Sequence, residues 1–394
     1  MIKVIILSLF WVLSSFAVDS VKKDNTLPLN QRTRPDSQGN QTESGLLKNR
    51  KTSKVEPAAS PAVSSVQDPS RPQVGGVETF GTDKINAYAL KKFLGKDLSV
   101  WIAKGLAGDA SAPEWEKKLA ERVKKKYEFA YTDWSVTQYM EPEGLKLFMT
   151  LEVVEDKDVA RRMPFRPIPT ETLEDPGGVV AAWLEYEQLA FDLIGKDLLE
   201  PESEKCVAFH CPFGHQHTKL KKFEKIFVEG VKKHKNALVQ FRLKDGRELY
   251  RAAACYVLAY LSDGNEVIRL MQESLHDPSF SVRNNALRVL GDVTEYHPQL
   301  VVSVAPILEA LAFPKVSDRM KAVYILNLMV MNSNKVREEV LKHSIPDLFA
   351  LMNTEQPYVQ ELTHGVLRKV SGKDYAAKDQ DAWRLWQRSI ASQK

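Results

Sequence analysis

The stretch that decides the fold runs from Asp277 to Gly291 and reads DPSFSVRNNALRVLG. Its pattern of acidic, basic, small and apolar residues returns once upstream and once downstream. The equivalent positions hold Asp245, Arg251, Ala254 and Leu258 in the upstream copy, and Pro314, Arg319, Ala322 and Leu326 in the downstream copy. A period of this size is typical of stacked helix pairs, in which each pair buries its apolar face only against its neighbours.

Each repeated residue type has a physical reason. Asp or Pro before the second helix of a pair caps or starts that helix. Alanine is small enough for two helices to cross closely, and leucine fills the core that they share. Arginine recurs at one position, as Arg251, Arg283 and Arg319, where it can lie over carbonyls or acids of the adjoining turn. We therefore interpret the three arginines as a structural ladder. The last unit, at 358–370, lacks this arginine, as end units of a stack often do.

The repeated phrase resembles HEAT repeats, and most closely the bacterial HEAT type often labelled phycobilisome-lyase-like. The segment from Val370 to Trp386 is similar to the closing segment of secreted bacterial HEAT-repeat proteins. The resemblance covers residues 217–390. It implies an α-solenoid that acts in partner binding or assembly, with Gly372 ending a helix and Trp383 and Trp386 covering the open end of the stack. The lyase label does not transfer, because the sequence supplies no set of residues for handling a bilin.

The first 83 residues are predicted to lie outside the fold. Residues 1–17 combine a positive start, an apolar run from Val4 to Phe16 and small residues before a cleavage point after Ala17, which together indicate a signal peptide. The apolar run is too short to span a membrane comfortably. Residues 18–83 are rich in Ser, Pro, Gln and Lys and predict a disordered linker. We expect an exported protein, periplasmic or extracellular, with no stable membrane insertion after cleavage.

Residues 84–205 predict a small α+β domain. Helical spacing of apolar residues appears in 85–93, 115–127 and 179–194. Between them, residues 145–153 alternate apolar and polar side chains, which favours a strand with one face in a core. Residues 131–140 are the expected hairpin partner of that strand. The arginines of 156–166 either grip an anion or, as is more usual, pair internally with acids.

The densest chemical cluster lies at the start of the last domain, 206–394. It consists of Cys206, His210, Cys211, His215 and His217. Thiolate and imidazole groups suit zinc or copper, although this spacing matches no familiar metal-binding motif. Alternatively, Cys206 and Cys211 form a disulfide, as export permits. In a third interpretation the cluster only packs, with reduced cysteines.

Composition narrows the possible functions. The chain has 394 residues, 43% hydrophobic and 27% charged, with a net charge of +4 that is too small to argue for nucleic acid. No pair of residues forms a recognisable acid–base arrangement, so we expect no catalytic residues and no enzyme. The sequence predicts a mainly α protein that serves as an exported scaffold for a protein or peptide partner, without a cofactor. The alternative is a metal-binding or redox-active protein centred on 206–217.

Overall fold

The computed structural model describes residues 72–141, 144–199 and 207–391. The predicted signal peptide at 1–17 and most of the predicted linker lie outside the described residues. The described chain is mainly helical with one small sheet, and it buries two hydrophobic clusters. One cluster lies between the sheet and three N-terminal helices, and the other runs through the C-terminal helices from Val179 to Trp386.

The sheet has three strands in the order β1-β3-β2. These are β1 (Gln73–Phe80), β2 (Tyr131–Glu141) and β3 (Gly144–Val154). The predicted hairpin is present, because β2 pairs antiparallel with β3 from Tyr131 opposite Val154 to Glu141 opposite Gly144. Strand β1 pairs parallel with β3. The prediction that residues 18–83 form a disordered linker is therefore wrong for residues 73–80, which belong to the sheet. The Val and Phe side chains of β1 supply the apolar surface that a linker lacks.

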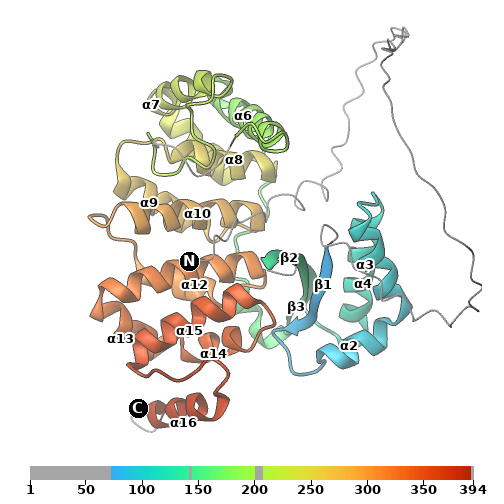
Figure 1. Ribbon diagram of the computed structural model, residues 1–394. Coiled ribbons are helices and arrows are strands. Elements are labelled where there is room, and N and C mark those ends of the chain that lie inside the picture. Colours follow the sequence, from blue (N-terminus) through green and yellow to red (C-terminus); the bar gives the residue numbers. More distant parts are fainter. Residues whose placement is uncertain (1–71, 142–143, 200–206, 392–394) are drawn as a thin grey trace, which may run out of the picture.

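Helices α2 (Ala87–Leu94), α3 (Lys96–Leu106) and α4 (Ala112–Tyr127) cover one face of the sheet. The core between them contains Leu119 and Val123 of α4 with Leu151 of β3, all fully buried. Trp101 of α3 packs against Trp134 of β2, with ring centroids 4.8 Å apart. The sheet thus lies between these helices and the C-terminal helices (Figure 1).

The second face of β3 differs from the prediction. Alternation assigned its polar positions to solvent, but Thr150 and Glu152 are fully buried. Their partners come from the C-terminal helices: Gln356 donates to the Thr150 hydroxyl over 2.9 Å, and Arg319 pairs with Glu152. A buried polar side chain is tolerated when it is hydrogen-bonded. The even positions of β3 therefore form a polar docking surface instead of a solvated one.

The C-terminal helices follow one another in a stack (Figure 1). Their bounds are α6 (Val179–Ile194), α7 (Lys221–Lys244), α8 (Glu248–Leu258), α9 (Gly264–Ser274), α10 (Phe280–Tyr296), α11 (Val304–Ala310), α12 (Val316–Asn332), α13 (Asn334–His343), α14 (Ile345–Met352), α15 (Pro357–Ser371) and α16 (Gln380–Ala391). Helix α10 packs against α8 on one side and α12 on the other, and α12 packs in turn against α15. The fully buried Ala254, Ala286 and Ala322 lie on α8, α10 and α12.

The predicted boundary at residue 205 is wrong for α6. This helix was assigned to the α+β domain, but its aromatic side chains pack against α7 and α8. Trp183 lies 5.1 Å from both Phe227 and Tyr256, measured between ring centroids. The apolar stripe of α6 is buried by the first stacked helices because α7 and α8 leave a large aromatic surface that must be covered.

The far end of the stack ends on α16. Gly372 follows α15 in the left-handed conformation, with φ of 66°, and its amide donates to the Arg368 carbonyl. Trp383 of α16 is fully buried against Tyr375 and Trp386. Glycine adopts this conformation without strain from a β-carbon. Within the described residues, no helix is both long and apolar enough to cross a membrane.

Candidate functional site

The predicted metal ligands do not converge in the described part of the chain. No group of three His, Cys, Asp or Glu side chains within residues 72–141, 144–199 and 207–391 could hold a metal ion. Cys206 lies outside the described residues. The other four candidates occupy three local environments: Cys211 and His215 share one, and His210 and His217 each have their own.

His210 is held by a helix of the stack. It is 6% exposed, its Nδ1 lies 2.6 Å from the Asp292 carboxylate of α10, and its ring stacks on Tyr256 with centroids 4.7 Å apart. Its buried Nε2 has no hydrogen-bond partner among the described residues. The ring therefore joins the loop before α7 to both α8 and α10. Its role in the described structure is packing and pairing.

His215 and Cys211 meet at Tyr260, which follows α8. The His215 Nε2 lies 2.5 Å from the Tyr260 hydroxyl, and the Cys211 sulfur lies 3.8 Å from the same oxygen. Burial raises the pKa of Tyr260 well above its usual value, so the hydroxyl keeps its proton. His217 is half-buried and accepts a 3.3 Å hydrogen bond from the amide of Lys219.

The cysteines differ in state. Cys211 is disulfide-bonded, whereas Cys255 on α8 is free and buried, where burial raises its pKa to about 11. A thiol with such a pKa is inert at neutral pH. Because Cys206 lies outside the described residues, the pairing of Cys206 with Cys211 stays a prediction.

The three repeated arginines make the same contacts in successive units. In each, one guanidinium nitrogen donates to the carbonyl six residues earlier: Arg251 to Asp245, Arg283 to Asp277 and Arg319 to Phe313. Each also pairs with a buried carboxylate of the next layer. Those pairs are Arg251–Asp277 at 2.9 Å, Arg283–Asp318 at 2.8 Å and Arg319–Glu152 at 2.9 Å.

The last pair of this arginine ladder crosses between parts of the fold. Asp277 and Asp318 come from the stack itself, but Glu152 is on β3. Glu152 also accepts a 2.8 Å hydrogen bond from the Val316 amide, at the start of α12. The sheet thus supplies to Arg319 the kind of carboxylate that the stack itself supplies to Arg251 and Arg283. Repeat spacing alone cannot reveal this, since the acid lies 167 residues from its arginine.

A strap formed by residues 163–175 runs along the same edge of the stack. Its Arg166 amide donates to the His276 carbonyl over 2.8 Å, and its Leu173 amide donates to Asp245 over 3.0 Å. Phe165 lies under the Arg283 guanidinium, 4.0 Å from ring centroid to carbon. The strap and the sheet thus cover the edge that holds the arginine ladder.

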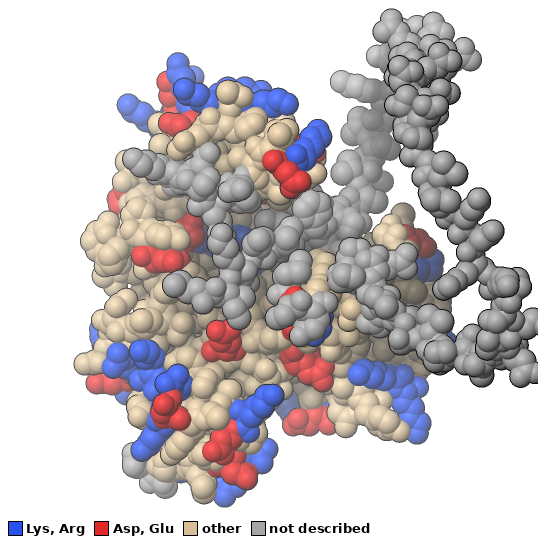
Figure 2. Space-filling model, in the orientation of Figure 1, with Lys and Arg blue, Asp and Glu red and all other residues tan. Residues whose placement is uncertain are grey.

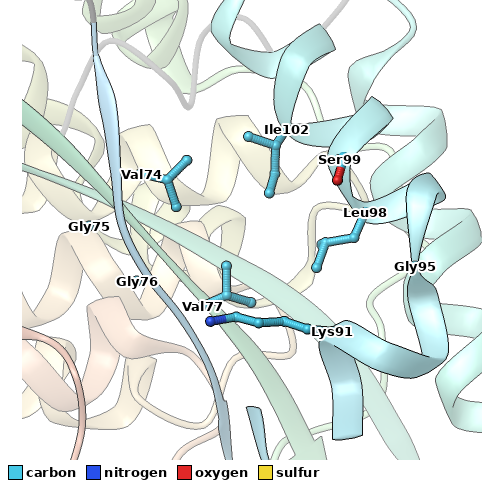
Figure 3. Close-up of a pocket in the computed structure, with 9 residues that line it drawn as sticks. All are labelled: Val74, Gly75, Gly76, Val77, Lys91, Gly95, Leu98, Ser99 and Ile102. Atoms are coloured by element: carbon cyan, nitrogen blue, oxygen red, sulfur yellow. The ribbon is translucent and has the colours of Figure 1, made fainter. Parts of the chain in front are cut away.

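Two surface hollows are present near the sheet. The first has a volume of about 480 Å³ and lies between β1 and helices α2 and α3. Figure 3 shows Val74 and Val77 facing Leu98 and Ile102 across it, with Lys91 reaching toward β1. Lys91 is the one titratable residue among those that line it, so the hollow has no acid–base pair.

The second hollow, of about 390 Å³, lies where the sheet meets the stack. Several of its charged side chains already have partners. Arg161 pairs with Asp347 at 2.8 Å, and Glu155 accepts a hydrogen bond from Thr82. Arg162 forms no ion pair of this kind: its Nε donates to the Ala312 carbonyl over 2.9 Å, and its buried Nη2 has no hydrogen-bond partner in the described structure. These arginines dock the sheet onto the stack.

The lysines of α7 gather at one end of the stack, while both signs of charge mix over the visible face (Figure 2). Several of these lysines face acids. Lys222 pairs with Glu185 at 2.8 Å, and Lys235 pairs with Glu266 at 3.1 Å. The pairs reduce the local positive potential at this end.

A different set of charged residues was missed by sequence reasoning. Glu187 on α6, Arg288 on α10 and Lys321 on α12 are half-buried and interact electrostatically. Burial raises the pKa of Glu187 to about 7, partly offset by Arg288. Burial, and then the charge of Arg288, lowers the pKa of Lys321 well below its usual value, although Asp318 opposes the shift. Perturbed pKa values on one face are a pointer to function. Alignment of the repeats could have shown that Arg288 and Lys321 share this face.

No family model matches this chain, and no curated protein matches it significantly in sequence.

Proposed function

We propose that the protein is an exported, non-catalytic HEAT-like α-solenoid scaffold that binds a protein or peptide partner. The observation that carries the proposal is the continuous packing of α8, α10, α12 and α15 into one hydrophobic cluster. Stacks of this kind present extended surfaces along their helices. The equivalent contacts of Arg251, Arg283 and Arg319 support a repeating unit.

The docking of the sheet supports one particular binding face. The sheet contacts the loops that begin α12 and α15, through Lys315, Val316, Glu355 and Gln356. Half-buried side chains on the outward sides of the same helices include Arg288, Lys321, Tyr324 and Tyr358. We name the outward side of α10, α12 and α15 the second-helix face, and we assign partner binding to it.

Export is part of the proposal. It is supported by the predicted signal peptide at 1–17 and by the disulfide bond of Cys211, because disulfides persist mainly in oxidising compartments. Periplasmic and extracellular locations both satisfy this argument.

A photo-crosslinking amino acid at Glu361 tests the binding face. Glu361 is exposed on α15 and interacts electrostatically with Tyr358, whereas Glu338 is exposed on α13 and serves as the matched control. We expect irradiation of cells that export the protein to give a discrete adduct from position 361 and none from position 338. Adducts from neither position, or the same adducts from both, would contradict partner binding at this face.

A further inference from the structure

The second-helix face has a regular arrangement that follows from the repeats. When the units are aligned on Ala254, Ala286 and Ala322, two further positions are half-buried on α10 and α12, whereas their counterparts on α8 are buried. The position two residues later holds Tyr256, Arg288 and Tyr324. The position one residue earlier holds Ala253, Asn285 and Lys321. These two positions lie three residues apart, about one helical turn, and therefore share one side of each helix. Because α10 packs against α12, Arg288 and Lys321 belong to one patch.

Arg288 and Lys321 differ from the fully buried arginines of the ladder. Arg251, Arg283 and Arg319 each pair with a carboxylate, but neither Arg288 nor Lys321 forms an ion pair or a hydrogen bond with any described residue. Both are half-buried, and each lies within the electrostatic range of the other. Half-burial without a hydrogen-bonded carboxylate makes the charged forms of these side chains costly, and the pKa of Lys321 is lowered accordingly.

The acids near this patch pair with other residues, although the buried Asp318 also attracts Lys321 electrostatically. Asp318 is bound by Arg283, Asp292 by His210, and Glu295 accepts the Tyr324 hydroxyl. The remaining acid, Glu187, forms no ion pair with Arg288, and its raised pKa weakens its negative charge near neutral pH. The fold therefore leaves the patch short of negative charge.

We propose that Arg288 and Lys321 form a subsite for a carboxylate of an acidic peptide segment in the partner, lying across α10 and α12. This inference rests on the proposed function and names the chemistry of the partner. The Arg288 guanidinium can grip a carboxylate with two parallel hydrogen bonds, and a bound carboxylate favours the protonated, charged form of Lys321. The neighbouring Tyr324 and Tyr358 provide aromatic surface for the aliphatic part of the segment.

A binding assay with defined probes tests the subsite. Fluorescence anisotropy would compare a labelled Glu/Ser peptide with the same peptide carrying Gln at each Glu, using the full mature chain at low salt. We expect the Glu peptide to bind and the Gln peptide to bind at least about tenfold more weakly, because charge-assisted hydrogen bonds are roughly twice as strong as neutral ones. Equal binding of the two peptides, or binding of neither, would overturn the proposal.

Variants that are expected to change peptide affinity in opposite directions make the test more specific. Arg288→Gln and Lys321→Met should each weaken the Glu peptide by roughly tenfold. Glu187→Gln should tighten it, because a competing carboxylate is removed. Arg269→Gln makes the same charge change on α9, at a side chain that is 63% exposed and 3.9 Å from Glu266, so it should leave affinity unchanged. An equal loss in Arg269→Gln would mean that net charge alone is measured, which refutes a defined subsite.

Two further measurements distinguish loss of the subsite from loss of folding, and a carboxylate ligand from phosphate. If Lys321→Met does not fold, as judged by circular dichroism, Lys321→Arg keeps the charge and should retain binding. Displacement of the peptide by inorganic phosphate at a concentration where acetate has no effect would assign the patch to phosphate and overturn the carboxylate proposal. A partner adduct at position 361 together with unchanged affinity in Arg288→Gln would reject this subsite while leaving the scaffold function standing.

Discussion

The pair between Arg319 and Glu152 allows a quantitative prediction about how the sheet is joined to the stack. Arg319 is 1% exposed and Glu152 is 0% exposed, and their atoms approach to 2.9 Å. Glu152→Ala removes the acceptor for both terminal guanidinium nitrogens and for the Val316 amide. The Arg319 Nε has no partner in the described structure, so the guanidinium would keep only backbone carbonyls.

A buried charge that loses its counter-ion costs about 3–5 kcal/mol, a large part of the roughly 5–15 kcal/mol that stabilises a typical domain. Urea unfolding of the mature chain, followed by tryptophan fluorescence, measures this loss. Trp134 reports on the sheet and Trp183 on the stack, so loss of coupling between them should also separate the unfolding into two transitions.

Arg161→Ala is the matched control, because it also breaks an ion pair between the sheet side and the stack. The Arg161 side chain is 55% exposed, and exposed pairs contribute about 0–1 kcal/mol. The double variant Glu152→Leu/Arg319→Met removes both charges and should be more stable than Glu152→Ala alone. If Glu152→Ala costs no more than Arg161→Ala, the buried pair does not hold the two parts together.

Three further predictions concern the cysteines, a buried acid and the end of the stack. Mass spectrometry without reductant should find Cys206 linked to Cys211, and it should find Cys255 alkylated only after the protein is unfolded. Elemental analysis should find no stoichiometric zinc or copper. One ion of either metal per chain would support the metal-binding hypothesis instead. Burial raises the pKa of Glu116 from 4.5 to about 7, so the folded state binds this proton more tightly than the unfolded state, and the resulting stability is present below pH 4.5 and lost as the pH rises through 7. Glu116→Gln should therefore flatten the dependence of melting temperature on pH. An unchanged slope in this variant would exclude Glu116 as the source of the dependence. Trp383→Ala should destabilise the protein by about 3–5 kcal/mol in urea unfolding, and a loss below that of the more exposed Arg161→Ala would show that α16 does not close the stack.

The sequence predicted the individual helices and strands because each depends on the spacing of apolar residues within one short segment. The alternation of 145–153 predicted β3, and the spacing in 131–140 predicted its hairpin partner. The helices of the last third were located from apolar spacing, whereas the placement of Trp383 at the end of the stack came from the resemblance to HEAT-repeat proteins. These features depend on residues close in the chain, where strand and helix periods are read directly.

The tertiary structure decided which surfaces meet. No residue near Glu152 in the sequence identifies it as the partner of Arg319. Strand β1 belongs to the fold because its backbone pairs with the edge of β3. Arg288 and Lys321 are a second example, because nothing in the local sequence distinguishes either residue from other helix positions. Only the packing of α10 against α12 brings them together, and only the folded chain shows that neither has a hydrogen-bonded carboxylate. Burial and charge balance depend on contacts between distant segments, and those contacts exist only in the folded chain.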